Sequence, residues 1–268
     1  MSAKSINRYQ TLIAHLFKKG YRKGRKAIAF DRTELEDAAN LLEVKLPKNL
    51  GDVIYSFRYR NPLPPEILKT QPEGMEWVIE GTGRARYEFR LVRVNRIEPN
   101  PNLVTTKIPD ATPEIVTAHA LSDEQALLAI IRYNRLIDVF LGITACSLQN
   151  HLRTTVSGLG QIEIDEIYVG MDRHGCQYVI PVQAKGGSDR LSTVQTKQDL
   201  ACCREKFPGL VCRSVSTQFM QDGSIVMFEL CLDEDASVKI TEERHYRLVP
   251  SDKISAKELD QYRQKSLQ

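Results

Sequence analysis

Four polar side chains stand on two stretches of residues 161–185, QIEIDEIYVGMDRHGCQYVIPVQAK, that otherwise have the composition of β-strands. Glu163 and Asp165 lie on the first stretch, and Gln183 and Lys185 on the second. An ordinary core hairpin would carry apolar residues at these places. Two carboxylates, an amide oxygen and an ammonium group on one surface are suited instead to binding a hard divalent cation.

The turn between the two stretches predicts their register. The sequence DRHGC at 172–176 is typical of a three-residue loop whose glycine takes the left-handed conformation. In that register Asp165 faces Gln183, and Glu163 faces Lys185. Because strand side chains alternate, all four project from one face of the hairpin. The other face carries the apolar residues Ile162, Ile164, Val182 and Ala184, which are expected to pack on helices.

These groups together indicate metal-assisted hydrolysis of a phosphodiester. Mg²⁺ takes one or two carboxylates and fills its other positions with water and substrate phosphate. It polarises the phosphate and lowers the pKa of a bound water, while a nearby ammonium group can orient that water and offset negative charge. The predicted cofactor is therefore Mg²⁺, with Mn²⁺ as a substitute.

Asp165 followed by Gln183-Ala184-Lys185 across a hairpin resembles the PD-(D/E)xK nuclease superfamily, whose members have the restriction-endonuclease-like fold. The resemblance implies an α/β (α+β) domain: a mixed sheet flanked by helices in the order αβββαβ, with the motif on a central hairpin. It implies that Asp165 and Gln183 are metal ligands and that Lys185 orients the attacking water. Glu163 stands where a further metal or water contact can arise, and a homodimer acting on double-stranded DNA is implied as well.

The sequence departs from the family pattern at two positions. Ile164 stands where proline is common, and Gln183 replaces an acid, so the metal should be held more weakly. An upstream helical acid, either Glu124 or Asp138, can supply an extra ligand, and the sequence does not choose between them. On the helix after the motif, Gln195, Gln198 and Asp199 either flank the site or are merely polar surface residues.

Three alternatives stay open at this point. The fold can be an inert one in a DNA-binding regulator, with Gln183 as the sign of lost activity. It can belong to a structure-specific repair nuclease or an RNase. The four polar residues can also be only a cross-strand ion pair between Glu163 and Lys185 beside a polar pair, worth about 0.2–1 kcal/mol.

Charge is unevenly distributed along the 268 residues, whose net charge is +3. Residues 1–60 hold 13 Lys/Arg against 6 Asp/Glu, a net +7, which leaves −4 for the rest. The densest basic run is KKGYRKGRK at 18–26, which is typical of a surface that meets a polyanion, although a solvated basic surface would look the same.

The N-terminal third is similar in element order to a winged helix-turn-helix domain. Apolar spacing predicts helices within residues 5–18, 31–44 and 46–60, and alternation around GTGR predicts a hairpin over 75–94. In such a domain the third helix enters the major groove and the hairpin touches the DNA backbone. The predicted nucleic-acid-binding residues are Lys18, Lys19, Arg22, Lys23, Arg25, Lys26, Tyr55, Arg58, Arg60, Arg84 and Arg86.

Four segments follow from these patterns. We expect a winged-helix-like DNA-binding domain over 1–95, a proline-rich linker over 96–116, the nuclease domain over 117–250 and a C-terminal tail over 251–268. In the nuclease domain, helices are expected at 122–143, 144–156 and 190–207, and strands at 210–220 and 224–232 beside the hairpin.

No stretch has the roughly 20 apolar residues of a membrane span, and the start MSAKSINRYQ has no apolar signal region. The six cysteines show no zinc-ligand spacing. The sequence therefore predicts a cytoplasmic protein that does not bind membranes: a Mg²⁺-dependent endonuclease of type II restriction character.

Overall fold

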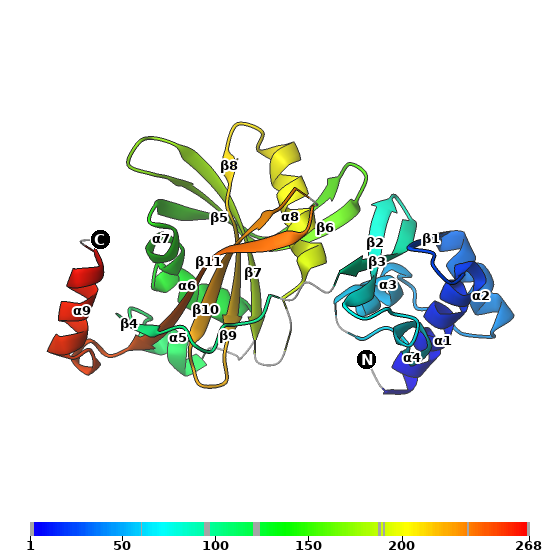
Figure 1. Ribbon diagram of the computed structural model, residues 1–268, viewed down its shortest axis with the longest axis horizontal. Coiled ribbons are helices and arrows are strands. Elements are labelled where there is room, and N and C mark those ends of the chain that lie inside the picture. The colour runs from blue at the N-terminus through cyan, green and yellow to red at the C-terminus, as the bar shows by residue number, and fades with distance from the viewer. Residues whose placement is uncertain are drawn as a thin grey trace. The chain divides into compact units, whose positions relative to one another are not determined.

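The computed structural model describes residues 3–59, 61–93, 97–119, 124–186, 189, 191–234 and 236–266 (Figure 1). The chain divides into two compact units. The first consists of Met1–Asn95 together with Thr154–Ile162, and the second of Arg96–Arg153 together with Glu163–Gln268. Residues 154–162 of the first unit were not foreseen from the sequence.

The first unit contains helices around a three-stranded sheet of order β1-β3-β2 with antiparallel pairs. The expected helices and hairpin are present, while β1 and α4 were not foreseen. The elements are α1 (Ala3–Gly20), β1 (Ala27–Asp31), α2 (Arg32–Leu41), α3 (Gly51–Tyr59), α4 (Pro65–Leu68), β2 (Met75–Gly83) and β3 (Arg86–Arg93).

An aromatic cluster forms the core of the first unit. Phe17 on α1 meets the rings of Trp77 and Phe89 edge-on, with centroids 5.0 and 5.3 Å away. At the start of α2, Asp31 and Glu34 form a capping box, in which each side chain accepts from the other residue's backbone N–H. The helix therefore begins where β1 ends.

The second unit is built on a mixed sheet of order β4-β11-β10-β9-β7-β6-β5, with β8 paired to β7 outside this path. β9 runs parallel to β7, and β4 parallel to β11. The strands are β4 (Thr105–Pro109), β5 (Thr144–Val156), β6 (Gly160–Met171), β7 (Gln177–Gly186), β8 (Val211–Cys212), β9 (Ser214–Phe219), β10 (Ile225–Leu232) and β11 (Val238–Val249). The helices are α5 (Glu114–His119), α6 (Glu124–Tyr133), α7 (Leu136–Leu141), α8 (Thr193–Lys206), the 3-10 turn η1 (Ser251–Lys253) and α9 (Ala256–Ser266).

Alternation along β7 decides which helices cover which face of the sheet. Val182 shares a buried cluster with Leu128 of α6, on the face that α6 and α7 cover. Val179 shares another cluster with Cys203 of α8. Because successive side chains of a strand point to opposite faces, Gln183 lies on the face that α8 covers. The apolar face of the hairpin thus packs on helices, as expected.

The expected helix over 144–156 is wrong, because these residues form strand β5. Ala145, Leu148 and Leu152 have helical spacing, but Leu148 is 52% exposed, so this spacing marks no buried helical face. β-branched residues at 144 and 154–156 favour a strand, and β6 is available as a partner. The order around the motif therefore becomes α7, β5, β6, β7, α8, β8 and β9, in which β8 has only two residues.

Three further boundaries need correction. The expected linker over 96–116 contains β4, which pairs with β11 inside the second unit. The expected tail over 251–268 contains α9, whose Tyr262 hydroxyl accepts from the backbone N–H of Lys107, 3.1 Å away. The helix expected over 122–143 is divided into α6 and α7 at Arg135, which has a φ of 48°. Local composition did not reveal these contacts, because the partners lie far apart in the sequence.

Within the described ranges, none of the helices combines the length and the apolar composition that a membrane-spanning helix requires.

Candidate active site

The β6–β7 hairpin has the register that its turn predicted. Its pairs run from Met171 opposite Gln177 to Glu166 opposite Val182. The turn closes with a hydrogen bond of 3.1 Å from the backbone N–H of Asp172 to the carbonyl of Cys176. The glycine of this turn, Gly175, has a φ of 82°, the left-handed conformation that such a loop requires.

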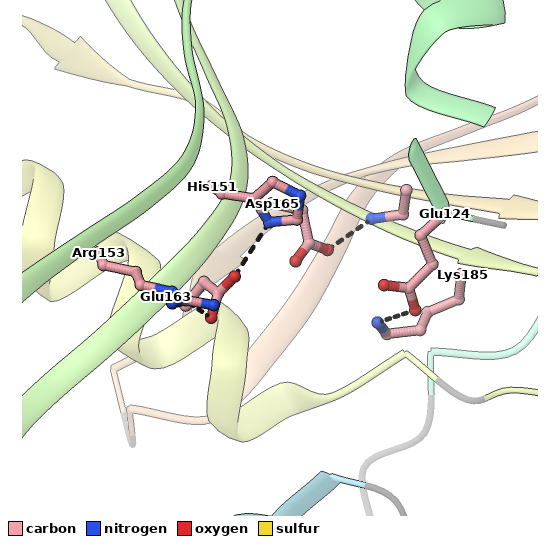
Figure 2. A network of polar contacts seen from close by, with 7 residues as sticks. Glu124, His151, Arg153, Glu163, Asp165 and Lys185 are labelled. Atoms are coloured by element: carbon pink, nitrogen blue, oxygen red, sulfur yellow. Dashed lines mark hydrogen bonds and ion pairs between the residues drawn. The ribbon is translucent and has the colours of Figure 1, made fainter. Parts of the chain in front are cut away.

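The pairing of β6 with β7 ends at Glu166 and Val182, and the next contact between the two strands is made by the Asp165 side chain. Oδ2 of Asp165 accepts a hydrogen bond of 3.1 Å from the backbone N–H of Ala184 (Figure 2). Asp165 and Gln183 therefore share a face without forming a ladder pair, which corrects the expectation that they pair directly. The half-buried carboxylate sits where the two strands stop pairing.

Electrostatics at Asp165 combine opposing effects. Burial raises the pKa of Asp165, while the Lys185 charge and the hydrogen bond from Ala184 lower it. The charges of Glu124 and Glu163 raise this pKa further, so the net direction is upward. A cation that binds here would favour the charged form of Asp165.

Gln183 is buried under α8. Its Nε2 atom donates to Oγ1 of Thr196 at 2.9 Å and lies 3.5 Å from Oδ2 of Asp199. Its Oε1 atom has no hydrogen-bond partner among the described residues. The amide is thus held by α8 through its nitrogen, with a buried oxygen left to accept.

Lys185 forms an ion pair with Glu124 at the first residue of α6, with 2.5 Å between Nζ and Oε1. This geometry decides which upstream acid reaches the site. The other candidate, Asp138, accepts from the backbone N–H of Ala145 at 3.0 Å and pairs with Arg135, so it ties α7 to the start of β5.

Glu163 does not face Lys185, contrary to the expected register at this end of the hairpin. Its carboxylate is held by two residues of β5: Oε1 lies 3.0 Å from Nδ1 of His151, and Oε2 lies 3.1 Å from Nε of Arg153. The Glu163 group and the Lys185–Glu124 pair lie on opposite sides of Asp165 in Figure 2. The cross-strand ion pair considered as an alternative is therefore not formed.

His151 and Arg153 were missed because residues 144–156 were assigned to a helix. His151 has a φ of 47°, in the left-handed region that a non-glycine residue seldom adopts. Strained positions of this kind cluster at functional sites. No sequence pattern identified either residue as a neighbour of Glu163.

The three polar residues of α8 that could flank the site are not surface residues. Gln195, Gln198 and Asp199 are all buried against the sheet. Burial raises the pKa of Asp199 well above the ordinary carboxyl value, and the charge of Asp165 raises it further. The sequence feature that could have indicated this burial was the density of polar residues on the helix that follows the motif.

Among the described residues, no three His, Cys, Asp or Glu side chains are gathered as a ready-made metal site. The donors near Asp165 are instead oxygen atoms of mixed type, including the buried, unpartnered Oε1 of Gln183. Such a set fits Mg²⁺, which needs only one or two protein carboxylates and keeps several waters.

The predicted nucleic-acid-binding residues fall into separate groups in the first unit. Arg84 lies in the β2–β3 turn and Arg86 begins β3, opposite Asp31. Residues 22–26 precede the other end of β1, so the five-residue strand separates the two groups by roughly 15 Å. Tyr55 and Arg58 lie on α3, and Arg60 lies outside the described residues.

Within the basic run, several charges are already engaged. Lys18 pairs with Glu66 at 3.5 Å and Lys19 with Glu34 at 2.8 Å. Arg25 donates to the carbonyls of Ala27 and Gly20 at 3.0 Å, and Arg22 donates to Tyr21. Lys23 and Lys26 are exposed.

Compared with protein-family models, with curated proteins and with solved structures, the chain matches none.

Proposed function

We propose that the protein is a Mg²⁺-dependent endonuclease that hydrolyses phosphodiester bonds of double-stranded DNA, in the manner of a type II restriction enzyme. The observation that supports this proposal is the hydrogen bond from the backbone N–H of Ala184 to Asp165, which forms where β6–β7 pairing ends after Glu166 and Val182. Mn²⁺ would replace Mg²⁺, and cutting both strands would require two copies of the site, as in a homodimer.

The order of elements around the motif supports the restriction-endonuclease-like fold. A helix, three strands and a second helix follow one another as α7, β5, β6, β7 and α8, and β9 comes next after the two-residue strand β8. The parallel pairing of β9 with β7 requires a crossover, which α8 provides. The motif then lies on the inner strands β6 and β7 of the sheet.

The residues have distinct tasks in this proposal. When bound, Mg²⁺ would polarise the scissile phosphate and lower the pKa of a coordinated water. Asp165 and the amide oxygen of Gln183 would hold it. Lys185 would orient the attacking water and offset the negative charge on the phosphoryl oxygens, while Glu124 holds the ammonium group in place at 2.5 Å.

The first unit would bind the DNA. Its helices and its β2–β3 hairpin have the order of a winged helix-turn-helix, in which α3 would enter the major groove. Exposed Arg84 and Arg86 at the hairpin turn would contact backbone phosphates.

The test is cleavage of plasmid DNA by the purified protein in Mg²⁺, in Mn²⁺ and in EDTA. Asp165→Asn should reduce metal-dependent cutting by about 100-fold or more, the usual cost of losing a group that stabilises the transition state. The matched control is Asp138→Asn, because Asp138 also accepts a backbone N–H, at 3.0 Å, but binds Ala145. Equal losses in both variants would contradict the assignment of Asp165.

A DNA-binding regulator is the second candidate, and the neutral Gln183 favours it, since α8 already holds its amide nitrogen. It predicts salt-sensitive DNA binding with no cutting in either metal. Substrates with junctions, flaps or RNA belong in the same assay, because a preference for them would identify a repair nuclease or an RNase instead.

A further inference from the structure

Two buried oxygen atoms near the motif lack hydrogen-bond partners within the described part of the chain. They are Oδ1 of Asp199 and Oε1 of Gln183, and each residue is only 1% exposed. Buried polar atoms are nearly always satisfied in proteins, so each exception calls for an explanation such as an ion or a water. Because Oδ2 of Asp199 lies 3.5 Å from Nε2 of Gln183, the two side chains are neighbours.

The surroundings of this pair are polar. Ser216 of β9 stands in register with Gln183, and its Oγ atom also has no partner among the described residues. Asp165 lies close enough for its charge to act on Asp199. Two carboxylates and an amide oxygen are therefore gathered between α8 and the sheet.

We propose that Asp199 supplies the carboxylate that position 183 lacks, so that a divalent cation is held by Asp165, Asp199 and the side-chain oxygen of Gln183. This inference rests on the proposed function and identifies the ligand set of the same site. A half-turn of the Gln183 amide about its terminal bond would exchange Nε2 for Oε1 and present an oxygen to the cation.

The energetic reason is the cost of a buried carboxylate. Removing such a group from water is unfavourable unless a charge or several hydrogen bonds compensate it. Among the described residues, no Lys, Arg or His forms an ion pair with Asp199, and its carboxylate accepts only a long hydrogen bond, of 3.5 Å, from Gln183. A divalent cation between Asp165 and Asp199 would remove their repulsion and satisfy Oδ1.

Other acids near the motif are already engaged. Glu124 pairs with Lys185 at 2.5 Å, and Glu163 is held by His151 and Arg153. Glu166 is fully buried but lies on the opposite face of β6, with Arg132 3.1 Å away. Asp199 is thus the buried carboxylate that lies next to position 183.

The test measures binding of Mn²⁺ alone to the full chain, by calorimetry and by the rise in Tm on adding metal. We expect Asp199→Asn to weaken Mn²⁺ binding by at least about 10-fold, because even outer-shell partners of metal ligands contribute about 10- to 100-fold to affinity, and to reduce the metal-induced rise in Tm. Glu166→Gln is the matched control, because it neutralises an equally buried acid of the opposite face. It should leave Mn²⁺ affinity unchanged.

The double variant Gln183→Glu/Asp199→Asn exchanges the acid and the amide. The variant keeps one acid and one amide at positions 183 and 199, so we expect it to fold even if Asp199→Asn alone does not. We expect it to recover most of the Mn²⁺ affinity.

The outcomes separate this inference from the proposed function. If Asp165→Asn abolishes Mn²⁺ binding while Asp199→Asn binds as tightly as wild type, Asp199 is not a ligand and the metal site still stands. If wild type itself binds no Mn²⁺, both the metal-dependent activity and the role of Asp199 are overturned.

Discussion

The carboxylate of Asp165 accepts its hydrogen bond from the backbone N–H of Ala184, 3.1 Å away, at the point where β6 and β7 stop pairing as strands. A side chain thus satisfies a donor that a ladder would otherwise occupy. The arrangement holds Asp165 in place between the motif residues at positions 183 and 185.

Lys185 and Glu124 should affect cleavage unequally. Lys185→Ala removes the group that orients water, so cutting of plasmid DNA should fall about 100-fold or more. Glu124→Gln leaves the ammonium group in place but loosens it, so the loss should be smaller. Lys206→Ala, at an exposed lysine of α8, is the control and should cut at the wild-type rate. A Lys185→Ala variant that cuts normally would show that another hairpin carries the activity.

The affinity for DNA should fall with added salt, and individual basic residues of the first unit should each contribute to this salt dependence. Arg84→Ala and Lys23→Ala should each lower the slope of log affinity against log salt by about 1, because each removes one phosphate contact. Fluorescence anisotropy with duplex DNA over a salt series measures this slope. Lys253→Ala, in η1 of the second unit, should leave it unchanged. If only Arg84→Ala changes the slope, the duplex contacts the β2–β3 turn and not the loop at the other end of β1.

Acid should loosen the docking of α9. Glu258 accepts hydrogen bonds from Lys107 at 2.9 Å and from the N–H and hydroxyl of Ser255, which lower its pKa to about 2 from 4.5. A carboxyl group whose pKa is lower in the folded state contributes stability above about pH 4.5 and loses it as pH falls towards 2. Hydrogen exchange of α9 between pH 7 and pH 2 should report this loss. Glu258→Gln should remove most of the pH dependence, and an unchanged profile would exclude this contact as its origin.

The close approach of β6 to the start of β5 can be tested at a glycine. A Cβ atom on Gly170 would lie 2.8 Å from the carbonyl oxygen of Thr144, which is backbone and cannot easily move. Gly170→Ala should therefore lower the free energy of unfolding by about 1–3 kcal/mol. Gly209→Ala meets no atom within 4 Å and should change it by less than about 0.5 kcal/mol. Denaturant unfolding compares the two, and equal stabilities would contradict this strand packing.

The hairpin that carries the motif could be predicted because its determinants are local. Alternating apolar residues and a glycine in the left-handed region specify strands, turn and register within residues 161–185. The same reasoning failed at 144–156, where Ala145, Leu148 and Leu152 fit a helix as well as a strand. These residues form a strand because they pair with β6, and the local sequence pattern does not reveal a neighbouring strand.

The sequence could predict the register of the turn and the face shared by residues 163, 165, 183 and 185, because both depend on neighbours in the chain. The folded chain was needed to show that Glu124 rather than Asp138 reaches Lys185, that β5 holds Glu163, and that Asp199 is buried against Gln183. These contacts join elements that are distant in sequence, and they follow from how the helices pack on the sheet. Packing of this kind depends on the shapes of whole faces, so no short pattern of residues can specify it.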